Sequence, residues 1–339
     1  MRRFAGTLKS KSEDSQPSPD GDSSCGADRW AIILAGGDGT RLRPLTRMIA
    51  GDERPKQFCA LLGSETLLDQ TRGRVALAVP SAQTLFVLTR MHEPFYDPLL
   101  GDVPGERLVV QPRNAGTAPA ILYSLLRLSK AAPTSSAAFF PSDHYFSDDA
   151  AFMSHVETAF EATRDRDDMV VLLGINPEGP EGDYGWIEPA APGPAKDPHA
   201  LYRVQRFWEK PTPEFARGLL ERGCLWNSFV MVGRVSAFLK MIWHAAPELS
   251  DLFNSIVPAL DTPEEERSVE ELYSQLGDVN FSHQVLAARP RSLAVLRVGG
   301  LIWSDLGRPQ RVLSMMADAG PSPRAQRTRV LAAAGSQSG

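Results

Sequence analysis

Residues Trp30–Arg47 read WAIILAGGDGTRLRPLTR, and this stretch decides the fold class and the first functional hypothesis. A short apolar run, typical of a buried strand, leads directly into Gly36, Gly37 and Gly39. Glycines at the end of a strand let the backbone come close to a phosphate, because no Cβ is in the way. Successive backbone N–H groups can then surround an anion.

Positive charge follows the glycines at two places. Arg41 comes directly after them, and Lys56 lies in the segment Pro55–Phe58, which reads PKQF. A polyphosphate requires fixed cations of this kind. The combination predicts a site for a nucleoside triphosphate.

Other interpretations of the glycines fit less well. The dinucleotide-binding fingerprint G-x-G-x-x-G would need a third glycine where Leu42 stands, and the Gly-Lys-Ser/Thr of a P-loop is absent. An ordinary strand-to-helix turn would explain Gly36 and Gly37 alone. It does not explain the further presence of Gly39, Arg41 and the Pro-Lys pair.

The stretch resembles the signature of the sugar-phosphate nucleotidyltransferases, and the PKQF form is similar to that of their mannose-1-phosphate guanylyltransferase members. Further matching segments follow in the same order between about residues 30 and 315. They are Gln111–Ile121, Phe140–His144, Gly182–Ile187, Phe207–Pro211, Trp226–Ser228 and Trp303–Gly307.

Three departures from the family pattern concern specificity. Guanylyl members usually read R-L-W-P-L-S where this chain has Arg41–Thr46, and the usual R-N-T-A-P is interrupted within Arg113–Pro119. Both departures bear on the identity of the base. Phe229 follows Trp226–Ser228 where a glycine is common, and this departure bears on the sugar.

The resemblance implies a magnesium-dependent attack of a hexose 1-phosphate on a nucleoside triphosphate, giving an NDP-hexose and pyrophosphate. GTP and mannose 1-phosphate are the favoured substrates. It implies catalytic roles for Arg41 and Lys56. The implied nucleotide-binding residues are Leu34, Ala35, Gly36, Gly37, Gly39, Thr40, Arg41, Lys56, Asn114, Thr117 and Ser142. The implied sugar-phosphate-binding residues are Gly185, Glu209, Lys210 and Asn227.

Two aspartates are the expected metal ligands. Asp143 follows an apolar strand, and ligands in open α/β sheets bind at the carboxyl ends of strands. A carboxylate there suits Mg²⁺, which takes few protein oxygens and keeps waters and phosphates. Asp305 is the second ligand by resemblance. The alternatives are a helix cap for Asp143 and a turn residue for Asp305, and His144 is expected to be a structural neighbour.

The composition fits a soluble globular protein with one large α/β domain. The chain has 339 residues, 42% of them hydrophobic, and a net charge of −5, which argues against a nucleic-acid binder. The three cysteines are scattered and suggest neither a disulfide framework nor a metal site. They fit a reducing cytoplasm, and no apolar run is long enough to cross a membrane.

The chain is expected to divide into a disordered tail over 1–29, a nucleotidyltransferase domain over 30–315, and a C-terminal helix or disordered tail over 316–339. Short apolar runs alternate with helical patterns, which predicts a Rossmann-like, mostly parallel sheet with helices on both faces and a mixed extension that carries the sugar-side loops. Strands are expected at 30–35, 84–89, 107–111, 137–141, 169–174, 184–188, 202–208, 228–233 and 294–298. Helices are expected at 117–130, at 148–163 and after Thr212.

Three functional alternatives remain open at this stage. The first is the same reaction with another nucleoside triphosphate or sugar. The second is a non-catalytic relative that senses a sugar nucleotide, although Arg41, Lys56 and Asp143 are all present. The third is a dinucleotide oxidoreductase. A homodimer is possible, and the sequence does not give the oligomeric state.

Overall fold

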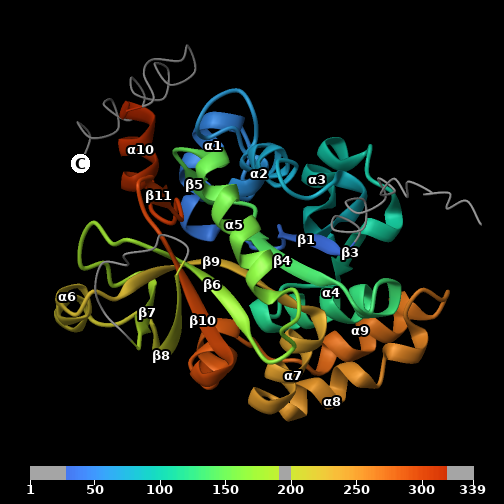
Figure 1. Ribbon diagram of the computed structural model, residues 1–339. Coiled ribbons are helices and arrows are strands. Elements are labelled where there is room, and N and C mark those ends of the chain that lie inside the picture. The colour runs from blue at the N-terminus through green and yellow to red at the C-terminus, as the bar shows by residue number, and fades with distance from the viewer. Residues whose placement is uncertain (1–27, 191–199, 319–339) are drawn as a thin grey trace, which may run out of the picture.

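The computed structural model describes residues 28–190 and 200–318 (Figure 1). Residues 1–27 of the predicted disordered tail lie outside the described part of the chain. Residues 319–339 of the predicted C-terminal segment also lie outside it. The first strand begins at Arg29, and the last helix, α10, spans Pro309–Asp318.

One nine-stranded sheet organises the protein, in the order β3–β2–β1–β4–β9–β6–β10–β8–β7. The strands are β1 Arg29–Leu34, β2 Thr84–Thr89, β3 Leu108–Gln111, β4 Ser136–Pro141, β6 Val170–Ile175, β7 Gly185–Pro189, β8 Leu201–Glu209, β9 Leu225–Arg234 and β10 Leu293–Val298. Each lies within two or three residues of its predicted position, and the α/β class is confirmed.

The sheet has a parallel part and a mixed part. Strands β3, β2, β1 and β4 pair in parallel, as do β6 and β10. Strand β9 runs antiparallel between β4 and β6, and β8 runs antiparallel to both β10 and β7. Strand β7 also pairs with β9, which folds the mixed part back on itself. The parallel strands therefore present their carboxyl ends along one edge, next to the loops of the mixed part.

Helices cover both faces of the sheet. On one face lie α4 Thr117–Ala131, α7 Val235–Ala245, α8 Pro247–Asn254 and α9 Glu265–Gln275, which gather at the lower right in Figure 1. On the other lie α2 Leu67–Val75, α3 Glu93–Leu100, α5 Asp149–Thr163 and α6 Pro213–Glu221. Strand β1 serves both cores, because side chains alternate along a strand: Ile32 packs on one face, and Ala31 and Ile33 on the other.

A third, smaller core joins the two ends of the described chain. Leu42 and Leu45 of the α1 region (α1 is Arg43–Ala50) pack with Leu306 and with Val312 and Met316 of α10. This packing brings α1, which follows the loop of Gly36 to Gly39 (the glycine loop), against α10, which follows Asp305.

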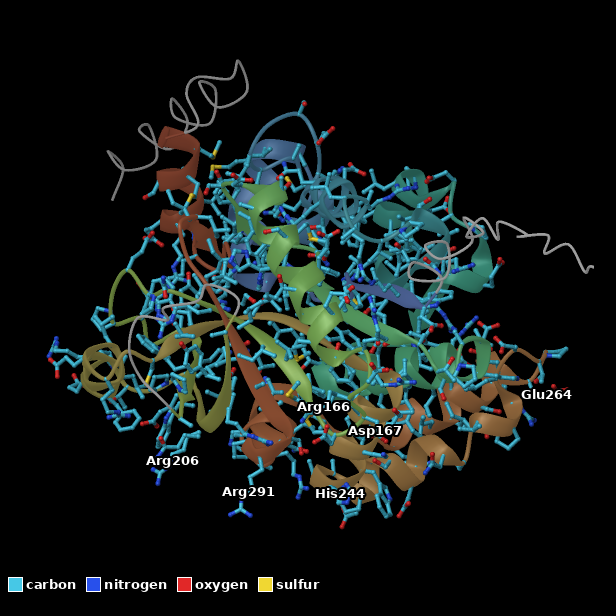
Figure 2. All side chains as sticks on the ribbon, in the orientation of Figure 1. Arg166, Asp167, Arg206, His244, Glu264 and Arg291 are labelled. Carbon is cyan, nitrogen blue, oxygen red and sulfur yellow. The ribbon has the colours of Figure 1, made fainter. Side chains whose placement is uncertain are left out.

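The labelled charged side chains Arg206, Glu264 and Arg291 project outward from the periphery (Figure 2).

A two-stranded sheet completes the frame. Strand β5, Tyr145–Phe146, pairs antiparallel with β11, Trp303–Ser304. The first lies shortly after Asp143, and the second directly before Asp305. The pairing therefore brings the two predicted metal ligands to the same place, although they are far apart in the sequence.

Candidate active site

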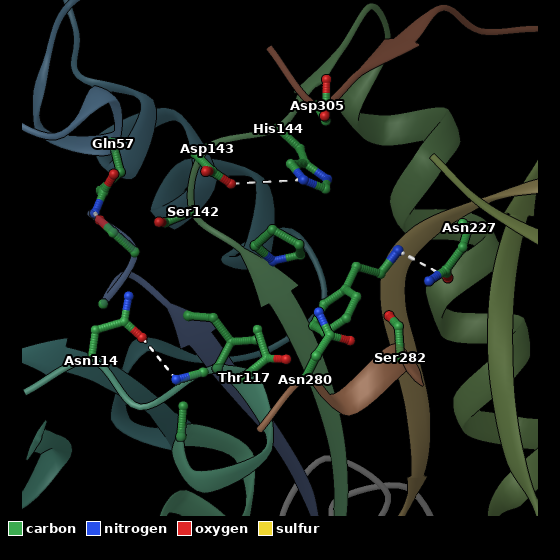
Figure 3. Close-up of a pocket in the computed structure, with 18 of the residues that line it drawn as sticks. Gln57, Asn114, Thr117, Ser142, Asp143, His144, Asn227, Asn280, Ser282 and Asp305 are labelled. Atoms are coloured by element: carbon green, nitrogen blue, oxygen red, sulfur yellow. Dashed lines mark hydrogen bonds and ion pairs between the residues drawn. The ribbon is translucent and has the colours of Figure 1, made fainter. Parts of the chain in front are cut away.

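A cavity of about 430 Å³ opens at the carboxyl ends of the parallel strands, and a second of about 400 Å³ adjoins it (Figure 3). Both are lined by Asn114, Asp143, His144 and Asp305. Predicted site residues that line the first cavity also include Leu34, Gly36, Gly37, Thr117, Ser142, Gly185, Glu209, Lys210 and Asn227. Gly39, Thr40, Arg41 and Lys56 line the second.

Ala35 is the predicted site residue that lines neither cavity. It is 1% exposed, its amide donates to Val87 O over 2.8 Å, and its carbonyl accepts from Gln57 Nε2 over 2.9 Å. Its backbone is therefore engaged behind the glycine loop rather than toward the cavity.

Protein side chains donate hydrogen bonds to the carbonyls of the glycine loop, whereas its amides are left without acceptors. Thr89 Oγ1 donates to Gly36 O over 2.9 Å, and Gln57 Nε2 donates to Gly37 O over 2.7 Å. Among the described residues, no group accepts a hydrogen bond from the amides of Gly36 to Gly39. A run of N–H groups without acceptors beside a cavity is an arrangement that can bind an anion.

Gly39 fits the loop closely to the Pro-Lys segment. Its φ is +56°, and a Cβ there would lie 3.1 Å from Lys56 N and 3.4 Å from Pro55 Cα. A residue with a side chain would be strained in both respects. The two halves of the sequence signature thus make direct contact.

We expect Gly39→Ala to lower the free energy of unfolding by about 1–2 kcal/mol, because alanine is costly in the left-handed region. Gly37→Ala is the matched control, since nothing lies within 4 Å of a Cβ at that exposed position. It should leave stability within about 0.5 kcal/mol and raise the KM for the nucleotide. Urea unfolding with kinetics of both variants checks this, and equal stability losses would contradict it.

Lys56 joins the two aspartates. Its side chain is 10% exposed, and its ammonium lies 3.2 Å from Asp143 Oδ2. The ammonium also donates to the backbone carbonyls of Asp305 and Leu306. The positive charge therefore stands where two negative groups meet.

Asp305 is fixed by groups on one of its oxygens. Its Oδ1 accepts from Gly307 N and from Arg311 Nη1, both over 2.8 Å. Burial alone would raise the pKa of Asp305, but the charges of Lys56 and Arg311 and the hydrogen bond from Gly307 N help to hold that pKa below its ordinary value. The carboxylate of Asp305 is therefore ionised at neutral pH. Its Oδ2 takes part in neither the bond from Gly307 N nor the bond from Arg311 Nη1.

The donor set fits a magnesium ion shared with a nucleotide. The described residues contain no group of three or more His, Cys, Asp or Glu that could hold a metal. Asp143 and Asp305 offer oxygen ligands at the wall shared by both cavities. Mg²⁺ is commonly bound by one or two carboxylates, with phosphates and waters completing its shell.

His144 is a structural neighbour of this donor set. Burial lowers the pKa of His144, and the centres of the His144 and Trp303 rings lie 5.4 Å apart.

The other end of the larger cavity gathers polar groups from three strands. A Cβ on Gly185 would lie 3.0 Å from Glu209 Oε2 and 3.4 Å from Asn227 Cβ, so the glycine is required by these neighbours. Burial raises the pKa of Glu209, opposed by the nearby Lys210 and a hydrogen bond with Ser282. Lys210 has φ +46°, and its half-exposed ammonium lies 3.6 Å from Glu209 Oε1.

The loop before α4 is fixed by a distant segment. Asn114 Nδ2 donates to Asp38 Oδ2 over 3.0 Å, which ties this loop to the glycine loop. Thr117 Oγ1 accepts from Phe281 N over 2.8 Å, and a Cβ on Gly116 would collide with Val279 O at 2.5 Å. Both sides of the cavity are thus built on contacts between separate chain segments.

Several residues at the site are not predicted by the sequence. Gln57 and Asp183 lie within motifs that the family resemblance covers, so a signal exists for them, but no role follows from it. Asn280 and Ser282 carry no motif, and only the fold brings them to the cavity. Arg311 bonds Asp305, Glu181 and Asp183, and its guanidinium lies 4.4 Å from the Tyr184 ring centre.

Known proteins resemble this chain in sequence. A family model described as nucleotidyl transferase matches residues 30–320. The alginate biosynthesis protein AlgA of Pseudomonas aeruginosa is 29% identical over 81% of this chain and 56% of its own length. A mannose-1-phosphate guanylyltransferase of Escherichia coli is 27% identical over 82% of this chain and 58% of its own. The chain thus spans little more than half the length of these relatives.

The fold also has solved counterparts. A crystal structure described as mannose-1-phosphate geranyltransferase from Thermus thermophilus superposes with a TM-score of 0.73 at 28% identity. The match covers 86% of this chain and 79% of that one.

Among the described residues, no helix is both long and apolar enough to span a membrane.

Proposed function

The chain belongs to the nucleotidyl transferase family, and on that premise we propose that it joins a nucleoside triphosphate to a hexose 1-phosphate. A phosphate oxygen of the sugar attacks the α-phosphorus, and the bond from that phosphorus to the bridging oxygen breaks. Pyrophosphate leaves with the electron pair of that bond. The products are an NDP-hexose and pyrophosphate.

The observation that carries this proposal is the convergence of open amides, a lysine and two aspartates on one site. The amides of Gly36 to Gly39 would receive the β- and γ-phosphates, because no described residue accepts from them. Arg41 lines the adjoining cavity with Lys56 and would add charge. The reaction brings anions together, so charge stabilisation and positioning supply most of its catalysis.

Lys56 would contact the phosphates where the bond changes occur, since its ammonium lies beside Asp143 and the Asp305 backbone. Mg²⁺, held by Asp143 and Asp305, would supply charge neutralisation at the reacting phosphate. Glu209 would accept hydrogen bonds from sugar hydroxyls. Asn227 would accept hydrogen bonds from these hydroxyls through its amide oxygen and donate through its amide nitrogen. Lys210 would pair with the sugar phosphate, and its backbone is fixed by a 3.2 Å bond from its amide to Tyr184 O.

GTP and mannose 1-phosphate are the substrates we favour. Support comes from the PKQF motif and from relatives named as mannose-1-phosphate guanylyltransferases in Escherichia coli and Klebsiella pneumoniae, at 27% and 26% identity. Another base or sugar is the alternative within the class. A cytoplasmic location is also retained as a proposal, because the three scattered cysteines of the sequence suggest no disulfide framework. A homodimer is also retained as a proposal.

Pyrophosphate release tests the proposal. The protein is incubated with Mg²⁺ and each combination of four nucleoside triphosphates with mannose, glucose and N-acetylglucosamine 1-phosphates. We expect release in every competent pair to require both substrates, and to be fastest with GTP and mannose 1-phosphate. Release with none of the pairs, together with binding of a GDP-sugar, would favour a sensor. Tight binding of NAD(P) would favour an oxidoreductase.

Glu209→Gln should separate stability from function. Because burial raises the pKa of Glu209 in the folded state, ionising this carboxyl group opposes folding at pH values above that pKa. The variant should therefore melt at a higher temperature than wild type near neutral pH. This advantage should disappear below the unfolded pKa of about 4.3, where both states of wild type are protonated.

The same variant should raise the KM for the sugar 1-phosphate about tenfold or more, since it loses a charged acceptor, and leave the KM for the nucleotide unchanged. Glu157→Gln, at an exposed glutamate in the middle of α5, is the control and should change neither quantity. A pH-independent difference in melting temperature would contradict the burial argument.

A further inference from the structure

Strand β9 departs from regular pairing beside the proposed sugar end of the cavity. Its Met231 pairs with Leu172 of β6, and its Asn227 pairs with Gly174. One residue of β6 lies between these pairs, while β9 has Ser228, Phe229 and Val230 between them. The extra residues form a bulge, and bulges next to functional sites commonly redirect a side chain.

The bulge is stabilised by its own side chains. Ser228 Oγ donates to Leu173 O over 2.6 Å and accepts from Val230 N over 3.2 Å. Asn227 Oδ1 accepts from Phe229 N over 3.1 Å. These bonds hold Phe229 at φ +60°, a left-handed conformation that is unusual for a bulky residue. The surrounding structure thus imposes this conformation on Phe229.

The ring of Phe229 forms an apolar part of a mostly polar wall. Phe229 lines the larger cavity together with Glu209 and Asn227. Its ring packs edge to face against Phe281, with centres 6.4 Å apart. The neighbouring Ser282 lines the cavity together with Glu209, so the 281–282 segment borders the same end of the cavity (Figure 3 labels Asn227 and Ser282). Phe229 therefore lines this end of the cavity with Asn227 and packs against Phe281 of this segment.

We propose that Phe229 determines specificity for the sugar, an inference that rests on the proposed function. The ring occupies space beside Asn227 that a substituent on the sugar would need. It therefore selects unsubstituted hexose 1-phosphates over hexose 1-phosphates that carry an N-acetyl group. The bonds of Ser228 and Asn227 fix the direction in which the Phe229 side chain leaves the backbone, and the contact with Phe281 supports its ring.

Two variants test this inference. Phe229→Gly removes the ring and relieves the left-handed strain, whereas Phe229→Ala removes the ring and keeps the strain. We expect both to raise the ratio of kcat/KM for N-acetylglucosamine 1-phosphate to that for mannose 1-phosphate by about tenfold or more. The KM for GTP should stay within about twofold, since the ring lies at the sugar end.

The outcomes are distinguishable from those of the proposed function. An unchanged ratio in both variants, or a change in Phe229→Gly alone, would overturn the role of ring volume. Wild-type protein that releases pyrophosphate with no substrate pair would contradict the proposed function instead. If the wild-type protein is inactive, binding of N-acetylglucosamine 1-phosphate and mannose 1-phosphate is measured by calorimetric titration of wild type and both variants. A ratio of the two affinities that is the same in all three proteins would overturn the inference.

Discussion

Lys56→Ala is expected to lower kcat by a factor of about 10³ or more while the protein stays folded. The ammonium lies 3.2 Å from Asp143 Oδ2 and donates to the Asp305 carbonyl, so its charge is fixed at the junction of the two cavities. With alanine, the charge of an entering triphosphate is less well compensated. The loss should appear in kcat more than in the KM, because the charge that develops on the leaving pyrophosphate is greatest in the transition state.

Lys240→Ala is the matched control. Lys240 is 56% exposed and pairs with Asp167, whose side chain is 62% exposed (Asp167 is labelled in Figure 2). This variant should turn over at the wild-type rate. Steady-state kinetics with circular dichroism checks both variants. Lys56→Ala with wild-type-like product formation would remove the catalytic role of Lys56.

Asp143→Asn is expected to lower kcat by about 10²–10³ at a Mg²⁺ concentration that saturates wild type. The amide keeps the shape of the side chain and removes the negative charge that a divalent cation requires. The Mg²⁺ concentration for half-maximal rate should rise as well. Asp167→Asn, on the exposed surface, controls for the loss of a carboxylate.

Asp305→Asn should show the same metal dependence, because both carboxylates are proposed to bind one ion. The double variant should then be little worse than either single variant, since residues that act as a unit are not additive. Losses that multiply, or an Asp143→Asn variant with an unaltered Mg²⁺ requirement, would contradict the shared ion.

The framework of the fold is predictable from the sequence because its signals are local. Apolar runs such as those of β1 and β6 mark strands, and helix-spaced apolar positions between strands mark a layered α/β fold. The carboxyl-end rule then places Asp143 beside the glycine loop. Most predicted site residues accordingly line the cavities, with Ala35 as the exception behind the loop.

The rest depends on contacts that leave little local trace. Strands β5 and β11 have two residues each, too short for a recognisable period, yet they bring Asp305 to Asp143. Helix α10 supplies Arg311 to Asp305 from a segment without a motif. Phe229 is visible in the sequence as a departure from the family pattern, but its left-handed conformation follows from the pairing of β9 with β6.

The most direct test of the central claim is a crystal structure of the protein grown with GTP and Mg²⁺. We expect one Mg²⁺ bound by oxygens of both Asp143 and Asp305 at about 2.1 Å, with phosphate oxygens completing its shell. The phosphates should accept from the amides of Gly36 to Gly39. GTP bound away from these amides, or a metal ion that touches only one of the aspartates, would contradict the account.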